Sequence, residues 1–324
     1  MRKLDYGFIL GKIKVLENKL IRFSLYERLA SSNSLDEFIT VLDETPYSNF
    51  ETDDFHKMMD YSEIEDNYIF EKYLPERWCF EFLYIRNDFQ NLRILLKATL
   101  SERALPEIKK RGNFSREEIV EVVSGEKKEN GFLYEVMNKA VKAYYGKESK
   151  RKDVVAMESE IDKGMYKYLL NNFPLSEFLK EYLKTEIDLF NISNILRFTV
   201  VDKVPLSEDF LIEGGNLKID FLKNIAVLPV DEITSALKIT HYSYILEQTN
   251  EQIKEGNFLF FVKMVKNHLI TLLKKTTYMG PSFEPVYRYF VLKNKERENL
   301  KRIFMGIKNN LDREKIIQGV VNAI

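Results

Sequence analysis

The sequence contains a single cysteine and no long apolar segment. Cys79 cannot form an internal disulfide, and its place beside Trp78 in an apolar run predicts a packed thiol in a reducing compartment. The longest apolar run, Phe258 to Val262, is far shorter than the roughly 20 residues that a membrane-spanning helix needs. Residues 1–5 lead into a mixed helix rather than toward a small-residue cleavage site, so no signal peptide is visible. We therefore expect a protein with no direct membrane span.

The residue patterns of common active sites are also missing. Three histidines, His56, His241 and His268, are widely separated, and none has the Cys/His spacing of a metal site. Gly214 and Gly215 lack the lysine and the serine or threonine that follow in a phosphate-binding loop. No nucleophile elbow occurs. We expect no catalytic residue, no cofactor and no metal, and hence a chain that is not an enzyme by itself.

The charges nearly cancel, with 49 Lys and Arg against 50 Asp and Glu, which argues against a general nucleic-acid binder. They are unevenly placed, because residues 43–71 hold ten acids and Lys57 as the only lysine or arginine. A solvated helix face is the simpler interpretation of this acidic stretch. The alternative is a surface that faces a partner, and its candidate residues are Asp53, Asp54, Glu63 and Glu65.

One pattern occurs three times, with successive acids about 100 residues apart. It reads aromatic, aliphatic, four residues, Asp or Glu, two residues, Asn, Leu or Ile. The acids and amides are Asp88 and Asn91, Asp188 and Asn191, and Glu296 and Asn299. A repeat of this length has the size of a small domain, so we interpret the chain as three copies of one helical domain.

Two further patterns recur in the same order. An Asn followed by Leu or Phe, and then by an acid and Leu or Ile, begins at Asn113, Asn216 and Asn310. Another pattern occurs twice with identical spacing, from Leu35 to Tyr47 and from Val230 to Tyr242. Helical spacing dominates and strand-like alternation is absent, which predicts an all-α protein. We expect domains at 1–112, 113–213 and 214–324, with a helix in 310–324 that completes the third domain or docks on the first.

The acid and the amide of each repeat share one helix face with the apolar residues that follow them. Buried polar groups need hydrogen-bond partners. The catalytic interpretation is an acid with an orienting amide, and the structural one is a pair of side chains that fix a neighbouring turn through its backbone. Three copies favour the structural interpretation, because one enzyme seldom needs three equivalent sites whereas each of three domains needs its turn fixed.

The chain resembles the C subunits of the prokaryotic V/A-type ATPases, which are the counterparts of the eukaryotic d subunits. Residues 83–92 (Leu-Tyr-Ile-Arg-Asn-Asp-Phe-Gln-Asn-Leu) are similar to the family's Arg-Asn-Asp-x-x-Asn-Leu stretch, and residues 186–192 to its second-domain equivalent. Residues 210–217 resemble the Gly-Gly turn that opens the third domain, and Leu237, Thr240 and Tyr242 resemble the segment after it. The departures are Ile192 for the usual Leu and His241 where Pro is common.

This resemblance implies three similar helical domains arranged as a funnel with pseudo-threefold symmetry. It implies a non-catalytic central-stalk subunit of a rotary ATPase, a socket that joins the rotating shaft subunits to the membrane rotor (proteolipid) ring. Such a subunit passes torque for ATP-coupled proton or sodium transport. It would be cytoplasmic and attached peripherally to the inner face of the plasma membrane through the complex. An unrelated helical scaffold or adaptor built by triplication is the alternative.

Overall fold

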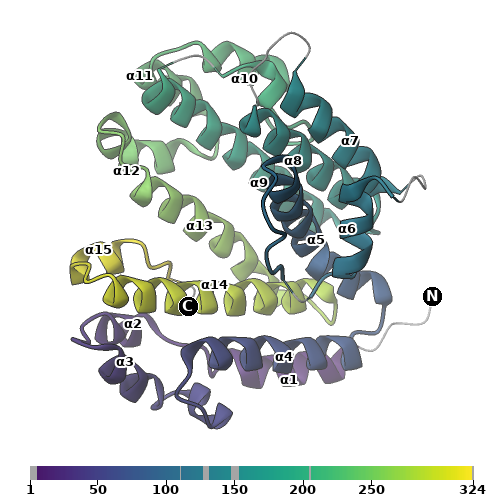
Figure 1. Ribbon diagram of the computed structural model, residues 1–324. Helices are drawn as coiled ribbons and strands as arrows, with labels where there is room; N and C mark the ends of the chain where they lie inside the picture. Colours follow the sequence, from purple (N-terminus) through teal and green to yellow (C-terminus); the bar gives the residue numbers. More distant parts are fainter. Residues whose placement is uncertain (1–5, 110, 127–130, 147–152, 204–205, 323–324) are drawn as a thin grey trace. The chain divides into compact units, whose positions relative to one another are not determined.

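The computed structural model describes residues 6–109, 111–126, 131–146, 153–203 and 206–322, and every regular element in these ranges is a helix (Figure 1). The predicted all-α class is therefore confirmed. Cys79 is buried, as its apolar neighbours predict. Among the described residues, no helix is both long enough and apolar enough to cross a membrane.

The chain divides into two compact units, and each combines elements of more than one predicted repeat. Unit 1 contains residues 1–77 and 237–324, and unit 2 contains residues 78–236. These limits differ from the repeat boundaries predicted at 112 and 213. The units group residues by contact and the repeats group them by residue pattern, so the division into three domains stays a prediction.

Unit 1 is built from two stretches of chain. Its elements are α1 (Gly7–Glu17), α2 (Phe23–Leu29), α3 (Leu35–Leu42), η1 (Pro46–Phe50), α4 (Phe55–Tyr73), η4 (Leu237–Ile239), α12 (Ser243–Lys254), α13 (Leu259–Lys274), η5 (Lys275–Tyr278), α14 (Phe283–Lys308) and α15 (Arg313–Gln318). The long helix α14 packs against α1, α2, α3, α13 and α15. It therefore joins the beginning of the chain to its end.

An apolar core of unit 1 forms where α14 meets α2, α3, α4 and α15. Phe304 stacks on Phe55 with ring centroids 4.3 Å apart, and Phe38 meets both rings edge-on. Ile316 of α15 and Val320 after it lie in the same cluster, so the C-terminal segment packs on residues from the first repeat.

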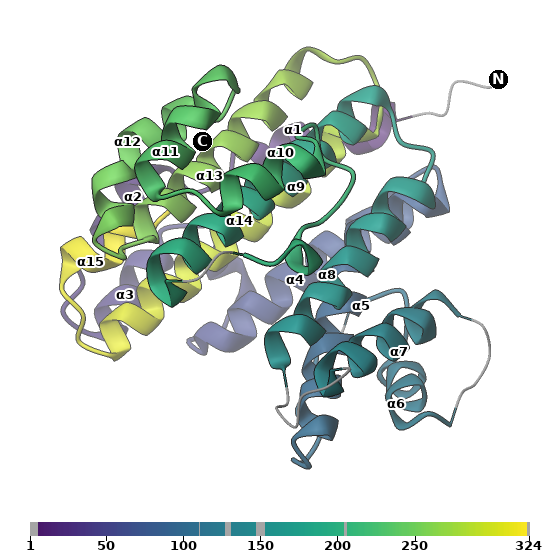
Figure 2. The ribbon, with the colours of Figure 1, turned by 90° about the horizontal axis from the view of Figure 1, so that it is seen from above.

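Unit 2 is one continuous stretch. Its elements are α5 (Arg77–Leu100), α6 (Arg116–Ser124), α7 (Phe132–Tyr145), α8 (Val154–Asn171), α9 (Glu177–Arg197), η2 (Phe198–Asp202), η3 (Glu208–Phe210), α10 (Ile219–Ala226) and α11 (Val230–Ala236). The most extensive helix pair is α7 with α8, which lie side by side (Figure 2). Gly164 allows this approach, because a Cβ there would lie 2.5 Å from Cγ2 of Val136.

Local sequence explains where several helices begin. The Ser115 hydroxyl accepts a hydrogen bond from the Glu118 N–H, and the Glu118 carboxylate accepts one from the Ser115 N–H. This is a capping box, with the Ser-x-x-Glu spacing typical of that motif, and it satisfies two N–H groups that a helix start leaves free. Asp54 caps α4 in a similar way, accepting from the N–H groups of His56 and Lys57.

Candidate functional site: three acid–amide clamps

Each asparagine of the triplicated pattern forms two hydrogen bonds with one backbone residue. Asn91 donates from Nδ2 to the carbonyl of Lys109 at 3.1 Å and accepts the Lys109 N–H at 3.0 Å. The same two bonds join Asn191 to Ile212 (2.8 and 2.9 Å) and Asn299 to Val321 (2.8 and 3.0 Å). All three asparagines are at most 2% exposed. Each amide therefore supplies, inside the protein, the donor and acceptor that the backbone of an irregular segment needs.

The first two acids bind the segment that follows the asparagine's partner. Asp88 accepts hydrogen bonds from the N–H groups of Asn113 (2.9 Å) and Phe114 (3.2 Å). Asp188 accepts from Asn216 (3.0 Å) and Leu217 (3.0 Å). We call each set an acid–amide clamp: the acid and the asparagine of one long helix, with the backbone segment that they bind.

A glycine stands directly before the first donor in each of these two clamps. A Cβ on Gly112 would lie 2.1 Å from Oδ1 of Asp88, and a Cβ on Gly215 would lie 2.1 Å from Oδ1 of Asp188. Real Cβ atoms do not approach so closely, so these turns require glycine for space. In the sequence this requirement shows only as a glycine directly before the asparagine of the second pattern, Gly112 before Asn113 and Gly215 before Asn216.

The third acid binds the beginning of the chain. Glu296 accepts the Ile21 N–H at 2.6 Å and the Tyr47 hydroxyl at 3.0 Å. Ile21 directly precedes Arg22, the residue that caps α2, just as Phe114 and Leu217 directly precede the caps of α6 and α10. The third clamp is thus closed by Ile21 and Tyr47, which lie 275 and 249 positions from Glu296 in sequence.

Sequence reasoning placed Asn310 and Leu311 in the position that Ile21 occupies. In the structure these two residues directly follow the end of α14, and their N–H groups donate to the carbonyls of Ile307 and Gly306. Asn310 has the left-handed backbone of a helix end, with φ of 53°. The residue pattern matched because helix ends and clamp turns both favour asparagine.

The third clamp also differs chemically from the other two. Its acid is Glu296, which is one methylene longer than aspartate, and the residue aligned with Gly112 is Lys19. The longer acid and the lysine thus occur together, in the one clamp of the three that lacks the glycine.

Burial dominates the electrostatics of the first clamp. It raises the pKa of the Asp88 carboxyl to about 6, while the backbone N–H groups of Asn113 and Phe114 oppose that rise. A carboxyl with such a pKa could serve as a general acid or base. Asp88 is fully buried, however, and its oxygens face backbone donors. The arrangement fixes a turn and leaves no room for a substrate.

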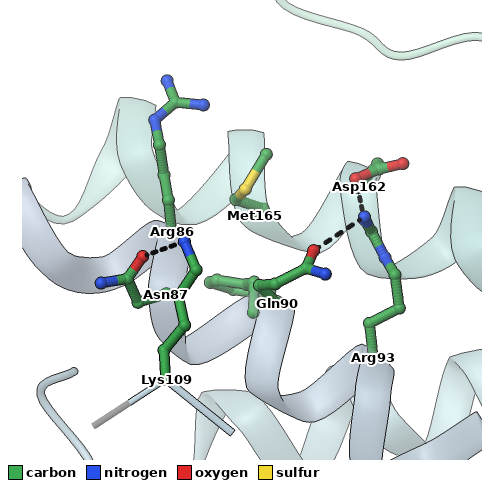
Figure 3. Close-up of a pocket in the computed structure, with 8 residues that line it drawn as sticks. Arg86, Asn87, Gln90, Arg93, Lys109, Asp162 and Met165 are labelled. Atoms are coloured by element: carbon green, nitrogen blue, oxygen red, sulfur yellow. Dashed lines mark hydrogen bonds and ion pairs between the residues drawn. The ribbon is translucent and has the colours of Figure 1, made fainter. Parts of the chain in front are cut away.

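A small polar pocket opens next to the first clamp, between α5 and α8 (Figure 3). It has a volume of about 350 Å³ and is lined by Arg86, Asn87, Phe89, Gln90, Arg93, Lys109, Asp162 and Met165. Figure 3 shows Arg93 directed at Asp162 and Lys109 directed at Asn87. The third cation, Arg86, pairs with Glu186 at 2.6 Å. The lining lacks a Ser, Cys or His nucleophile, and its two arginines are paired with acids of unit 2.

The acidic stretch divides between the surface and the interior. Asp53 and Glu65 are exposed, Glu63 is half-buried, and Asp54 is exposed while it caps α4. Within the part of the chain that the structure describes, no group of three or more His, Cys, Asp or Glu side chains could hold a metal ion.

Asp66, in the same stretch, is a neighbour of α14 that sequence reasoning missed. Its carboxylate pairs with Arg297 at 2.6 Å and accepts the Tyr289 hydroxyl at 2.8 Å. Arg297 also donates to Ser62. Asp66 and Arg297 are nearly fully buried. Nothing in the spacing of two residues so far apart in the sequence identifies them as a pair.

Comparison with known proteins finds similarity along nearly the whole chain. A family model described as ATP synthase (C/AC39) subunit matches residues 9–319. The C subunit of the A-type ATP synthase of Desulfurococcus sp. (strain SY) is 25% identical, over 96% of this chain and 89% of its own length. The proteins of that name from Thermococcus onnurineus and Pyrococcus horikoshii are each 24% identical, over 98% and 96% of this chain and 90% and 89% of their own lengths.

Proposed function

The chain belongs to the ATP synthase (C/AC39) subunit family, and we propose that it is the non-catalytic central-stalk subunit of a rotary V/A-type ATPase. In this role it is a socket between the rotating shaft subunits and the membrane rotor ring. It passes torque between ATP turnover and the transport of protons or sodium ions. It is cytoplasmic and held at the inner face of the plasma membrane by the complex.

The three clamps are the observation that carries this proposal. Each joins a long helix to the backbone segment that leads into another helix of its unit, and the third returns to the first repeat. A part that transmits torque must resist shear between its segments. Buried hydrogen bonds between side chains and backbone are shielded from competing water, so they suit that task.

The acidic stretch supports contact with a partner. Asp53 and Glu65 are exposed in the acidic stretch, and Asp54 and Glu63 lie near them in sequence. Exposed charges mainly set the rate and orientation of encounter with a partner. We propose that this stretch faces a partner within the complex.

Purification of a tagged chain from detergent-solubilised membranes tests the proposal. The expected result is co-purification of the shaft subunits and the ring proteolipid in fixed ratio, and loss of ATP-coupled ion transport when the chain is deleted. The chain alone is expected to hydrolyse no ATP. Recovery of the chain without shaft and ring would favour the scaffold alternative. Hydrolysis that purifies with the chain, and is lost on a point substitution in it, would contradict the non-catalytic role.

A further inference from the structure

The outward face of α4 carries an apolar stripe. Tyr61, Ile64 and Tyr68 are 43%, 53% and 56% exposed, although the opposite face of the same helix is buried in unit 1. Their spacing of three and four residues places them in one row along the helix. It is the spacing of the apolar seam by which one helix packs lengthwise against another. Helix α4 therefore has two apolar faces, of which unit 1 covers one.

Acidic side chains border this stripe on both sides. On a helical projection Asp60 lies to one side of the row and Glu65 to the other, and both are exposed. These are the flanking positions that select a partner by charge when two helices pair. Lys57 and Lys72 lie only toward the two ends of the stripe.

The apolar surface continues from α4 onto α1. Lys72 lies over the rings of Tyr68 and Tyr73, at 5.0 and 5.4 Å from their centroids, and the Phe8 ring is 4.7 Å from Tyr73. Phe8 is itself 57% exposed. The aromatic row thus extends across two helices that are in contact within unit 1. Lys12 lies over the Phe8 and Tyr73 rings, at 5.3 and 5.2 Å from their centroids, so lysines cover this end and the segment from Tyr61 to Tyr68 is the part bordered by acids.

We propose that this α4 face binds a basic amphipathic helix contributed by another protein of the complex. An apolar row removes the partner's apolar side chains from water, and the bordering acids pair with lysine or arginine beside them. A second copy of this chain would place Asp60 and Glu65 against like charges. An anionic lipid surface would meet the same acids, together with the rest of the acidic stretch, and would be repelled.

The inference deepens the proposed function and rests on it for the source of the helix. Within that function it identifies α4 as a docking element and names the chemistry of the segment that it receives. It also gives Glu65 a defined role, as one border of an apolar seam rather than as part of a diffuse acidic surface.

A photoreactive phenylalanine analogue at Ile64, in the purified complex, tests the inference. The matched control is the same analogue at Ile239, which is 88% exposed in the same unit. The expected product at position 64 joins α4 to a helical segment of another protein that carries Lys or Arg beside its apolar row. Linkage to lipid, to a second copy or to a non-basic segment, absence of any product, or linkage of the control to that same segment would overturn the proposal.

Rebinding of the purified chain to a complex stripped of it gives a second measurement. The variant Tyr61→Ser, Ile64→Ser, Tyr68→Ser is expected to bind about ten-fold more weakly or worse, because apolar anchors carry most of the binding energy. The variant Asp60→Lys, Glu65→Lys is expected to bind more slowly at low salt, with the difference shrinking as salt rises. Wild-type rebinding by both variants would contradict the docking role.

Two failures are distinguishable in these experiments. A chain that purifies without shaft and ring refutes the proposed function. A chain that purifies with both, but whose Ile64 probe reaches no basic helix, refutes only the docking of such a helix on α4. Because all five substituted side chains are exposed, the thermal midpoints of the isolated variants should match the wild type, which separates lost binding from lost folding.

Discussion

At the residue scale, the clamps differ in the length of the acid and in the residue that stands beside it. Asp88 and Asp188 hold their turns so closely that the preceding residue has no room for a side chain. Glu296 reaches further, and Lys19 is accepted at the aligned position. The requirement for glycine at Gly112 and Gly215 is therefore a requirement for space.

We predict that Gly215→Ala lowers the free energy of unfolding by about 1–3 kcal/mol, because the new Cβ displaces the turn from the Asp188 carboxylate and leaves buried groups without their bonds. The control is Gly11→Ala in α1, where a Cβ meets open space. It should be neutral or stabilising by up to about 1 kcal/mol. Urea unfolding of both variants measures the difference, and equal midpoints would contradict the argument.

The raised pKa of Asp88 predicts a pH-dependent contribution to stability. Its folded-state pKa of about 6 lies above the ordinary value of 3.8, so the folded protein holds this proton more tightly than the unfolded chain does. The resulting stabilisation is fully present below about pH 3.8 and is lost as the pH rises through 6. The free energy of unfolding of the wild type, relative to that of Asp88→Asn, should therefore fall by on the order of 1–3 kcal/mol between pH 4 and pH 7. A difference independent of pH would refute this assignment.

At the element scale, α14 is held to α4 by a buried ion pair as well as by apolar contact. Arg297 reaches Asp66 and Ser62, and Tyr289 donates to the same carboxylate. An ion pair in the interior costs desolvation on both sides, so its net contribution to stability is small even though each partner depends on the other.

We predict that Arg297→Met destabilises the protein by about 3–5 kcal/mol, because Asp66 is left charged and buried without its partner. The double variant Arg297→Met, Asp66→Leu should recover a large part of that loss. A double-mutant cycle by chemical denaturation measures the coupling. Losses that simply add would show that the two side chains act independently.

The sequence predicted the helical class and the repeated acid and amide. It did not predict the contact between the Ile21 N–H and Glu296 that closes the third clamp. Helical spacing and the absence of strand patterns predicted the class. Asp88 and Asn91 stood out because a carboxylate and an amide recur on an apolar helix face. Ile21 carries no such signal, since its role is played by a backbone N–H that every residue except proline has. Residue patterns report side chains, so a contact through backbone must come from the structure.

At the scale of the whole molecule, the C-terminal segment is part of the core made by the N-terminal helices. Ile316 and Val320 lie in the cluster of α2 and α3, and Val321 is the partner of Asn299. Unit 2 contains none of these residues. The two units should therefore respond differently to loss of the chain's end.

We predict that truncation after Asn310 reduces hydrogen-exchange protection in α2, α3 and the C-terminal half of α14, because apolar contacts and the backbone partner of Asn299 are removed together. Protection in α7 and α8 of unit 2 should be retained. Hydrogen exchange read by mass spectrometry on the full-length and truncated chains gives both results at once. Equal loss in α7 and α8 would mean that the units unfold as one.

The third clamp also has a consequence for synthesis on the ribosome. Ile21 emerges early, and its partner Glu296 follows 275 residues later, which at ordinary elongation rates is a delay of roughly 14–55 s. Unit 2 is continuous and can fold while the chain is still growing. The apolar faces of α2 and α3 must instead wait, uncovered, for α14 to leave the exit tunnel. The newborn chain thus has a defined interval in which the apolar faces of its first helices lack their partner α14, and that interval ends when the last hundred residues arrive.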